Sequence, residues 1–581
     1  MKTKQIQCRK VKYYQHQSNA KPRNWWLAVF ALTLCINSGI VPLCTTNILL
    51  CLARLPGSGN KTNSKNIMAK QEDVFKKIVS HAKEYGFVFP SSEIYDGLGA
   101  VYDYGQNGVE MKNNIKRYWW EAMTLLHENI VGIDSAIFMH PTIWKASGHV
   151  DAFNDPLIDN RDSKKRYRAD VLIEDEIAKF DDKINKEVAK AAKRFGESFD
   201  EAMFRQTNPR VLEHQSKRDE LHQRYSDAMN ANDLKELRQI IEDYGIVDPI
   251  SGTKNWTDVR QFNLMFKTQM GSSADSTMDV YLRPETAQGI FVNFLNVQKT
   301  GRMRIPFGIA QIGKAFRNEI VARQFIFRMR EFEQMEMQFF VRPGDELEYF
   351  KKWKEARLKW HKALGMGDEK YRYHDHEKLA HYANAATDIE FLMPFGFKEV
   401  EGIHSRTDFD LSQHEKFSKK KIQYFDPELN KSYTPYVIET SIGVDRMFLS
   451  VLCSSYEEQQ LEGGDTRVVL HLPKALAPVK CAILPLVKKD GLPEKAHEIM
   501  NILKFDFACR YDEKDSVGKR YRRMDAIGTP YCITVDGQTL EDNTVTIRDR
   551  ETMEQQRVSI DELHAIISRE CSLNNLLKKL V

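Results

Sequence analysis

Apolar residues recur at helical spacing in the first half of the chain. The clearest run places them four residues apart, at Met111, Ile115, Trp119 and Met123. This spacing puts the four side chains on one side of a helix, so it predicts one long amphipathic helix. Residues 174–243 are rich in Glu, Lys, Ala and Arg and contain a single proline, Pro209, which predicts a largely helical insertion.

Strand patterns replace the helical ones in the second half. Strand-like runs cover 278–341 and 433–442, and residues 472–478 contain two prolines and indicate a linker. After the linker come a strand at 479–484, a helix at 493–504, a helix-like stretch at 516–526 and a strand at 531–535. This alternation predicts a small α/β domain.

Charge is unevenly distributed. The net charge is +4, but residues 1–70 contain eleven Lys or Arg and no Asp or Glu, which leaves 74 basic and 81 acidic residues in the other 511. The folded body is therefore slightly acidic, and any contact with nucleic acid must use local basic patches.

The N-terminal segment allows three interpretations. Residues 25–53 are apolar after a basic lead, but their longest uninterrupted stretch, 27–36, is too short to span a bilayer. The segment is an untranslated stretch before a start at Met68, a targeting peptide or a membrane anchor. No stable membrane association is expected for the folded body.

The cysteines indicate a reducing compartment. There are nine in the chain, and no two of them form a Cys-x-x-Cys pair. This pattern argues against a disulfide scaffold, a zinc ribbon and a thioredoxin-like site, and favours a cytoplasmic protein.

Two segments imitate known motifs. Residues 308–314 have the spacing of a phosphate-binding P-loop, but Ala315 stands where Ser or Thr would bind Mg²⁺. His376 and His381 resemble a zinc-protease pair, yet they are five residues apart rather than four, which turns them off a common helical face. No metal site formed by protein ligands alone is predicted.

The segments 316–319 and 327–336 have side chains that suit a ligand floor better than a core. A short linker separates them, which predicts an antiparallel strand pair joined by a loop. Alternation along a strand places Arg317 with Glu319, and it gathers three side chains of the return strand, namely Phe332, Gln334 and Glu336. Arg can bind a phosphate bidentately and Phe can stack on a planar base.

Residues 439–446 extend this chemistry. Glu439, Ser441 and Gly443 share a strand face, and the chain then enters a helix with Arg446 in its first turn. A cation there opposes the helix dipole, so an anionic ligand would resolve the conflict. An edge sheet with solvated salt bridges explains one such segment equally well; together with 282–289, the segments favour a ligand site.

These segments resemble the signature motifs of class II aminoacyl-tRNA synthetases, and more narrowly those of the homodimeric glycyl-tRNA synthetase family. Residues 316–319 with Phe332 are similar to motif 2, and 443–446 to motif 3. Residues 108–115 are similar to motif 1, which builds the dimer interface in that class. The resemblance runs from about Met68 to the C-terminus.

The resemblance implies an α+β fold. Its catalytic domain would contain an antiparallel sheet of six to seven strands flanked by helices. The expected parts are an N-terminal extension outside the fold (1–67), the first catalytic part (68–173), a mostly helical insertion (174–262), the second catalytic part (263–472) and an α/β anticodon-binding domain (473–581).

The resemblance also implies the activity. Glycine and ATP would give glycyl-adenylate and pyrophosphate, and glycine would then move to the 3′ end of tRNA(Gly). Mg²⁺ would arrive bound to ATP, and the protein would be a homodimer. A non-catalytic synthetase-like nucleic-acid-binding protein and a class II synthetase for another small amino acid are the alternatives.

Three residues would carry the ATP chemistry. By resemblance, Arg317 holds the α-phosphate, Glu319 contacts the adenine side and Arg446 meets the γ-phosphate. The implied ATP site comprises Arg317, Asn318, Glu319, Phe327, Arg328, Met329, Arg330, Glu331, Phe332, Glu399, Val400, Gly443, Val444, Asp445 and Arg446.

Glycine offers only an ammonium and a carboxylate. Glu285, Glu336 and Glu439 would surround the ammonium, and Ser441 would leave no room for a methyl group. The implied glycine site comprises Arg168, Glu285, Phe332, Glu333, Gln334, Met335, Glu336, Glu439, Thr440, Ser441, Ile442 and Gly443.

A basic cluster in the C-terminal domain is the candidate RNA contact. Its cations are Lys519, Arg520, Arg522 and Arg523. Clustered cations beside Tyr521 suit phosphate contact and base stacking, while a solvated helix face is the alternative.

Overall fold

The computed structural model describes residues 64–196, 199–271, 277–320, 324–376, 379–380, 382–461 and 464–581. The predictions on the first 63 residues lie outside these ranges, as does His381 of the histidine segment. Met68–Val581 forms one compact unit. Among the described helices, none combines the length and the apolar character that crossing a membrane requires.

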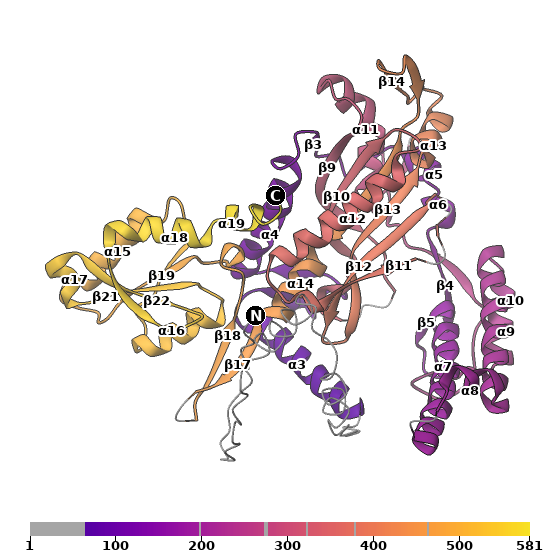
Figure 1. Ribbon diagram of the computed structural model, residues 1–581, viewed down its shortest axis with the longest axis horizontal. Coiled ribbons are helices and arrows are strands. Elements are labelled where there is room, and N and C mark those ends of the chain that lie inside the picture. The colour runs from indigo at the N-terminus through magenta and orange to yellow at the C-terminus, as the bar shows by residue number, and fades with distance from the viewer. Residues whose placement is uncertain are drawn as a thin grey trace, which may run out of the picture. The chain divides into compact units, whose positions relative to one another are not determined.

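A seven-stranded sheet forms the centre of the unit, in the order β11-β12-β13-β16-β10-β9-β3 (Figure 1). The strands are β3 (Ile130–Gly132), β9 (Phe307–Phe316), β10 (Glu331–Val341), β11 (Tyr371–Asp375), β12 (Ala385–Met393), β13 (Gly396–Thr407) and β16 (Tyr436–Gly443). Every neighbouring pair is antiparallel except β3 and β9. The predicted sheet of six to seven strands is confirmed, with one parallel edge strand.

The two faces of this sheet differ in chemistry. On β10, Met335, Met337 and Phe339 point into a large apolar core with helices α4 (Gln106–Thr124), α12 (Glu346–Ala363) and α14 (Val444–Ser455). The residues that alternate with them, Gln334, Glu336 and Gln338, point to the other face. Farther along that face, Phe340 packs with helices α11 (Ala287–Thr300) and α13 (Phe409–Ser418). This second face of the sheet is therefore polar at Gln334, Glu336 and Gln338 and apolar around Phe340.

Most of the predicted local elements form, although residues 287–300, within the predicted strand region 278–341, form helix α11. Helix α4 contains the apolar run from Met111 to Met123, and all four of its members are buried. The predicted strand–loop–strand is β9 and β10, which pair with Phe316 opposite Glu331. Residues 308–314 lie within β9, so the P-loop-like segment is an extended strand.

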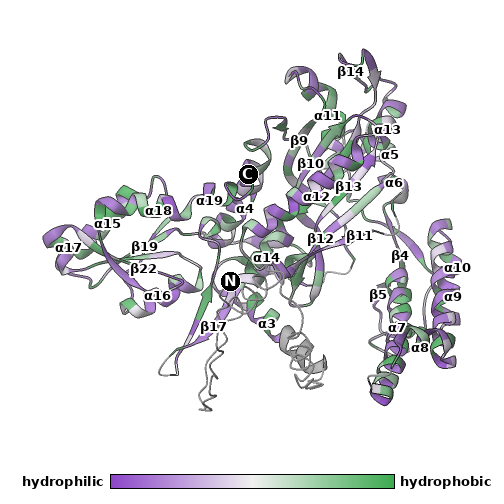
Figure 2. Cartoon of the chain, in the orientation of Figure 1, coloured by the Kyte–Doolittle hydropathy of each residue, from purple (hydrophilic) through white to green (hydrophobic). Residues whose placement is uncertain are grey.

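The insertion is helical, as predicted. Its helices are α7 (Ala169–Phe195), α8 (Glu201–Thr207), α9 (Pro209–Ala231) and α10 (Leu234–Asp243). Pro209 does not break a helix because it occupies the first turn of α9, where Asn208 caps the free N–H groups. Figure 2 shows hydrophobic and hydrophilic residues side by side along α7 and α9, as amphipathic packing requires.

The core of the insertion begins earlier than residue 174. Ile158 and Tyr167 share a hydrophobic cluster with Leu237, Ile240 and Trp256. A three-stranded sheet closes the base of this region, formed by β4 (Asn154–Asp159), β5 (Arg166–Arg168) and β6 (Arg260–Asn263). Residues 154–173, expected in the first catalytic part, therefore pack with the insertion.

The C-terminal domain is a five-stranded sheet in the order β20-β19-β21-β22-β23. Its strands are β19 (Cys481–Pro485), β20 (Cys509–Tyr511), β21 (Tyr531–Val535), β22 (Thr544–Asp549) and β23 (Gln555–Ser559). Its helices are α15 (Leu492–Leu503), α16 (Val517–Ala526), α17 (Gly537–Asp542), α18 (Leu563–Cys571) and α19 (Asn574–Leu577). Leu576 and Leu577 belong to the large apolar core that includes α4, α12 and α14 rather than to this domain's own cluster.

The remaining helices and strands complete the described structure. They are α3 (Ser64–Glu84), β1 (Val88–Pro90), β2 (Tyr102–Tyr104), α5 (Pro141–Ala146), α6 (His149–Ala152), β7 (Lys267–Met270), β8 (Met278–Tyr281), β14 (Tyr424–Asp426), β15 (Lys431–Tyr433), β17 (Tyr456–Gln460) and β18 (Thr466–Leu470).

Candidate active site

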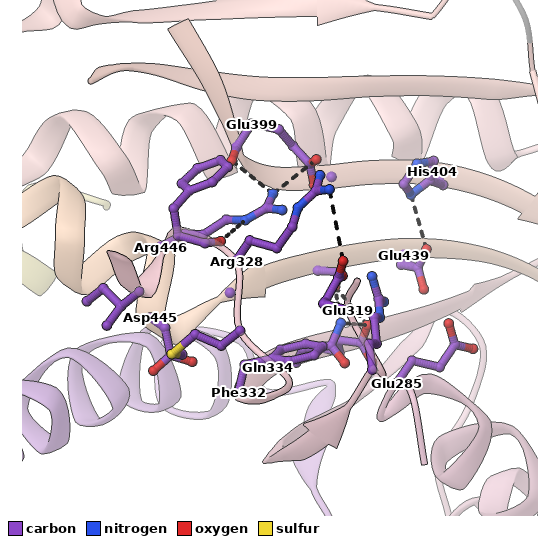
Figure 3. Close-up of a pocket in the computed structure, with 18 of the residues that line it drawn as sticks. Glu285, Glu319, Arg328, Phe332, Gln334, Glu399, His404, Glu439, Asp445 and Arg446 are labelled. Atoms are coloured by element: carbon purple, nitrogen blue, oxygen red, sulfur yellow. Dashed lines mark hydrogen bonds and ion pairs between the residues drawn. The ribbon is translucent and has the colours of Figure 1, made fainter. Parts of the chain in front are cut away.

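A cavity of about 230 Å³ opens on the polar face of the seven-stranded sheet. Its lining comprises Glu285, Arg317, Glu319, Ile326, Phe327, Arg328, Met329, Phe332, Gln334, Glu336, Tyr382, Glu399, Gly402, His404, Arg406, Glu439, Ser441, Gly443, Asp445 and Arg446. Figure 3 shows Glu285, Glu439 and His404 at one end, with Arg446, Glu399 and Arg328 toward the other. The predicted segments around 285, 317–336 and 439–446 thus converge.

Arg317 stands just beyond the end of β9. Its Nε donates a hydrogen bond to the carbonyl of Pro284 (3.1 Å), and its guanidinium lies 5.3 Å from the centre of the Phe332 ring. That bond leaves the two terminal amino groups for an acceptor with two oxygens, such as a phosphate. Phe332 offers the flat face beside which a base can stack.

Arg446 is held at the same end by the first turn of α14. It donates to the backbone carbonyl of Glu399 (3.1 Å) and lies 3.1 Å from the Glu399 carboxylate. Its guanidinium also covers the ring of Phe327 at 4.5 Å. Arg446 lowers the pKa of Glu399, so both side chains are charged. Arg446 could then exchange this carboxylate for an anionic ligand.

Two further arginines frame the loop between β9 and β10. Arg328 lies 3.9 Å from Glu319 and is 41% exposed, so it can turn toward a ligand. Arg330 instead fastens the loop, donating to the carbonyls of Glu319 (3.1 Å) and Gly99 (2.7 Å). Arg330 therefore supports the site without lining it.

The opposite end gathers three carboxylates, of which Glu336 and Glu439 are buried and Glu285 is partly buried. Glu336 accepts hydrogen bonds from Thr286 and from Ser441 Oγ (2.7 Å). Burial raises the pKa of Glu336 to about 7, and the charges of Glu439 and Glu285 add to the rise. One of the three acids therefore resists ionisation until a cation enters.

Glu439 is fully charged. Burial opposes its ionisation, but Arg406 and His404 outweigh burial and hold its pKa at about 2. Arg406 donates to both oxygens of Glu439 at 3.1 Å, and His404 Nδ1 lies 3.1 Å from Oε2. Gln338 donates the remaining bond at 2.9 Å.

Glu285 lies in the loop before α11. Burial opposes its charge, while His149, Arg406 and a hydrogen bond from Gln288 together lower its pKa. His149 Nε2 approaches to 3.5 Å. A small ligand with an ammonium could thus meet negative charge at this end and leave its own anionic group for the arginines at the other.

Several predicted residues point away from the cavity because strand side chains alternate. Glu333 pairs with Lys112 (2.8 Å) beneath the sheet, and Met335, Ile442, Val400 and Val444 belong to the apolar core. Thr440 is fully buried on the same strand as the lining residues Glu439 and Ser441. Within the predicted ranges 331–336 and 439–443, these residues therefore do not line the cavity.

Other predicted residues lie beside the cavity. Arg168 does not line it and binds Asp155 (3.1 Å) and Asp170 (2.5 Å). Glu331 pairs with Lys314 (2.8 Å), and the backbone N–H of Asn318 donates to Leu264 (2.8 Å). Asp445 does line the cavity, but its carboxylate already accepts from Lys112 and the Glu333 amide, both at 2.8 Å.

The sequence analysis predicted Glu399 of β13 at the site but missed the other lining residues of this strand. Gly402, His404 and Arg406 line the cavity, and Tyr382 lies 4.2 Å beneath the Arg406 guanidinium. The three alternate along one strand with buried Ile403 and Ser405. The signal available in the sequence was weak, because Glu401 and Ser405 make the opposite face of this strand polar as well.

The predicted RNA-binding cluster is divided by burial. Arg520 is 2% exposed and donates to the carbonyls of Pro485 (2.6 Å) and Asp512 (3.1 Å), so it cannot reach RNA. Arg523 binds Asp512 (2.7 Å) and Asp515 (2.8 Å). Lys519 and Arg522 are exposed on α16.

Comparisons with known proteins cover most of the compact unit. Residues 155–264 match the family described as glycyl-tRNA synthetase insertion domain 1. Residues 266–456 match the class II tRNA synthetase core domain (G, H, P, S and T), and residues 480–570 match the anticodon binding domain.

Named relatives agree. A glycine–tRNA ligase of Chlorobaculum tepidum is 53% identical over 488 residues, covering 84% of this chain and 97% of the relative. One of Staphylococcus haemolyticus is 51% identical over 499 residues, covering 85% and 98%. The fold resembles a prolyl-tRNA synthetase of Cryptosporidium parvum complexed with L-proline and AMP, with a TM-score of 0.50 and 11% identity over 87% of this chain and 76% of that one.

Proposed function

Since this chain belongs to the glycine–tRNA ligase family, we propose that it attaches glycine to tRNA(Gly) through a glycyl-adenylate intermediate. The observation that carries the proposal is the cavity with carboxylates at one end and arginines at the other. It suits a small zwitterion beside a polyphosphate, which is what glycine and ATP present.

The first step is a displacement at phosphorus. A glycine carboxylate oxygen attacks the α-phosphorus, the bond to the bridging oxygen breaks, and pyrophosphate leaves. We assign Arg317 to the α-phosphate, Phe332 to the adenine face and Arg446 to the γ-phosphate. Such a step needs positioning and neutralisation of charge more than a proton-transfer base, and the arginines supply both.

The carboxylate end binds and selects glycine. Glu285, Glu336 and Glu439 would surround the ammonium, and its charge would favour ionised Glu336. Ser441, bonded to Glu336, would face the α-carbon. Exclusion by size serves the smallest amino acid well, because every competitor is larger.

ATP brings Mg²⁺ as part of the substrate. Carboxylate oxygens are the protein ligands that Mg²⁺ prefers, and it usually keeps several waters. Glu399 fits a single such contact, since its side chain is 49% exposed and pairs with Arg446. In the second step the 3′ hydroxyl of the tRNA attacks the carbonyl carbon and AMP leaves.

Three finer assignments belong to the proposal. Lys519 and Arg522 would contact the anticodon region of the tRNA, since both are exposed on the C-terminal domain. The protein would be a homodimer through 108–115, tested by light scattering.

A cytoplasmic location fits five free cysteines among the described residues, and imaging of fluorescent fusions starting at Met1 and at Met68 tests it.

ATP–pyrophosphate exchange tests the proposal. Protein starting at Met68 is assayed with each of the twenty amino acids separately. Exchange with glycine alone is expected. Absence of exchange with any amino acid, in protein shown to be folded, would favour a non-catalytic nucleic-acid-binding role.

A further inference from the structure

A buried glutamine outside the cavity contacts one of its carboxylates. Gln288 lies in the first turn of α11 and is 0% exposed. Its Nε2 donates to Glu285 Oε1 (3.0 Å) and to Asp410 Oδ1 (2.9 Å). Its Oε1 faces His414 Nε2 at 2.8 Å. Both N–H groups and the carbonyl of this amide therefore have partners.

The chemistry of these partners fixes the orientation of the amide. A reversed Gln288 would place its carbonyl oxygen against two carboxylates, which can only accept hydrogen bonds when ionised. A glutamate here would bring three acids together. A neutral side chain with two donors on one atom is what the site requires.

Asp410 continues the chain of contacts to the second carboxylate. It binds Arg406 through both oxygens, at 2.8 Å from Nε and 3.1 Å from Nη2. The remaining amino group of Arg406 holds both oxygens of Glu439 at 3.1 Å. Asp410, Arg406 and Glu439 are all at most 5% exposed, so water does not weaken these bonds.

Glu285 and Glu439 are thereby joined through protein alone. They come from a loop and from β16, 154 positions apart in sequence by their numbers, yet both face the same end of the cavity (Figure 3). We propose that Gln288 and Asp410 are positioning residues that set the spacing of these two carboxylates and thereby the affinity for the glycine ammonium. This inference rests on the proposed function.

A purely architectural role is the competing explanation. The same bonds also fasten α13 to α11, since Asp410 and His414 belong to α13. Loss of architecture would affect both substrates, or lower stability alone. Loss of positioning would affect glycine selectively, because ATP binds at the other end.

The test is Gln288→Met, which keeps length and volume but removes both donors. Steady-state ATP–pyrophosphate exchange gives KM for glycine and for ATP separately. We expect KM for glycine to rise about tenfold or more, because misplaced contacts in a preorganised site are costly. KM for ATP should stay within about twofold.

Gln298→Met is the matched control. Gln298 lies in the same helix and donates one hydrogen bond to the Met303 carbonyl (3.0 Å), away from the cavity. It should leave both KM values unchanged. If Gln288→Met fails to fold, Asp410→Asn serves instead, with the same expected selectivity, and Asp410→Glu should bind glycine better than Asp410→Asn.

The outcomes separate the two proposals. The positioning role would be overturned if Gln288→Met raised KM for glycine and for ATP equally, or if the folded variant kept its affinity for glycine. In either case glycine-dependent exchange by the wild-type protein would still support the proposed function. Wild-type protein without glycine-dependent exchange would overturn the proposed function itself.

Discussion

Arg317 of the cavity and two arginines of helix α16 differ in how much of their hydrogen bonding the fold already uses. Arg317 donates one bond to a backbone carbonyl. Arg446 is intermediate, since it donates to the carbonyls of Glu399 (3.1 Å) and Phe327 (3.4 Å) and pairs with a Glu399 carboxylate that is half exposed. Arg520 instead donates to three backbone carbonyls, and Arg523 binds two aspartates. Arg317 therefore keeps donors for a ligand, whereas Arg520 and Arg523 use theirs to hold the fold together.

The largest effect is expected from Arg317→Ala, which tests whether the free donors of Arg317 bind the substrate. Removing a group that neutralises charge in the transition state should reduce kcat/KM for exchange on the order of 10³-fold. Thermal stability should change little, because Arg317 makes one hydrogen bond within the fold. Wild-type exchange in this variant would remove Arg317 from the site.

Arg520→Met should show the opposite behaviour. Three carbonyls would lose their buried donor, which should cost roughly 2–4 kcal/mol of unfolding free energy. Denaturant unfolding followed by fluorescence measures this, and glycine exchange by the folded fraction should be unchanged. Weakened tRNA binding at wild-type stability would contradict the structural role.

The carboxylate end of the cavity should make the activity with glycine depend on pH. Glu336, with its pKa raised to about 7 by burial and by Glu439 and Glu285, is protonated in the empty cavity below that value. An ammonium needs it ionised, so kcat/KM for glycine should fall about tenfold between pH 8 and pH 6. Glu439 stays ionised over this window, since its pKa is about 2.

Glu336→Gln provides the check on this assignment. The variant should be less active, and its pH profile from 8 to 6 should be flat. His149 and His404 face the other two carboxylates, so the profile of Glu336→Gln also reveals their contribution. An unchanged slope would assign the titration to a histidine.

The smallest effects are expected on the outer face of α16. Lys519→Ala and Arg522→Ala should each raise KM for tRNA about threefold, with the effect fading at high salt, because single phosphate contacts are weak and screened. Glycine exchange without tRNA should be unaffected. Filter binding gives the Kd for tRNA and aminoacylation gives the KM. Wild-type values of both in these variants would show that the outer face of α16 is solvated and does not contact tRNA.

Sequence patterns predict local elements better than neighbours across a sheet. The alternation of Phe332, Gln334 and Glu336 predicted correctly which side chains line the cavity. Arg317 and Glu319 were expected on a strand, but β9 ends at Phe316, and they line the cavity from the loop beyond it.

What the sequence did not reveal was non-local. Strand β13 pairs with β16 although the 28 residues 408–435 separate them, and no local pattern specifies that pairing. Arg520 was a different kind of miss. It precedes buried Met524 by one helical turn, so helical spacing already placed it on the inner face of α16.

The presence of Leu576 and Leu577 in the large apolar core has a consequence for synthesis on the ribosome. Helix α4, which packs against α19, is translated more than 400 residues earlier. Its contacts with β3, β9 and α14 are available earlier, but the contact with α19 must wait for the end of the chain, and such long-range contacts form slowly. A nascent chain paused before residue 576 would leave the α19-facing part of α4 uncovered, which is the kind of surface that chaperones bind.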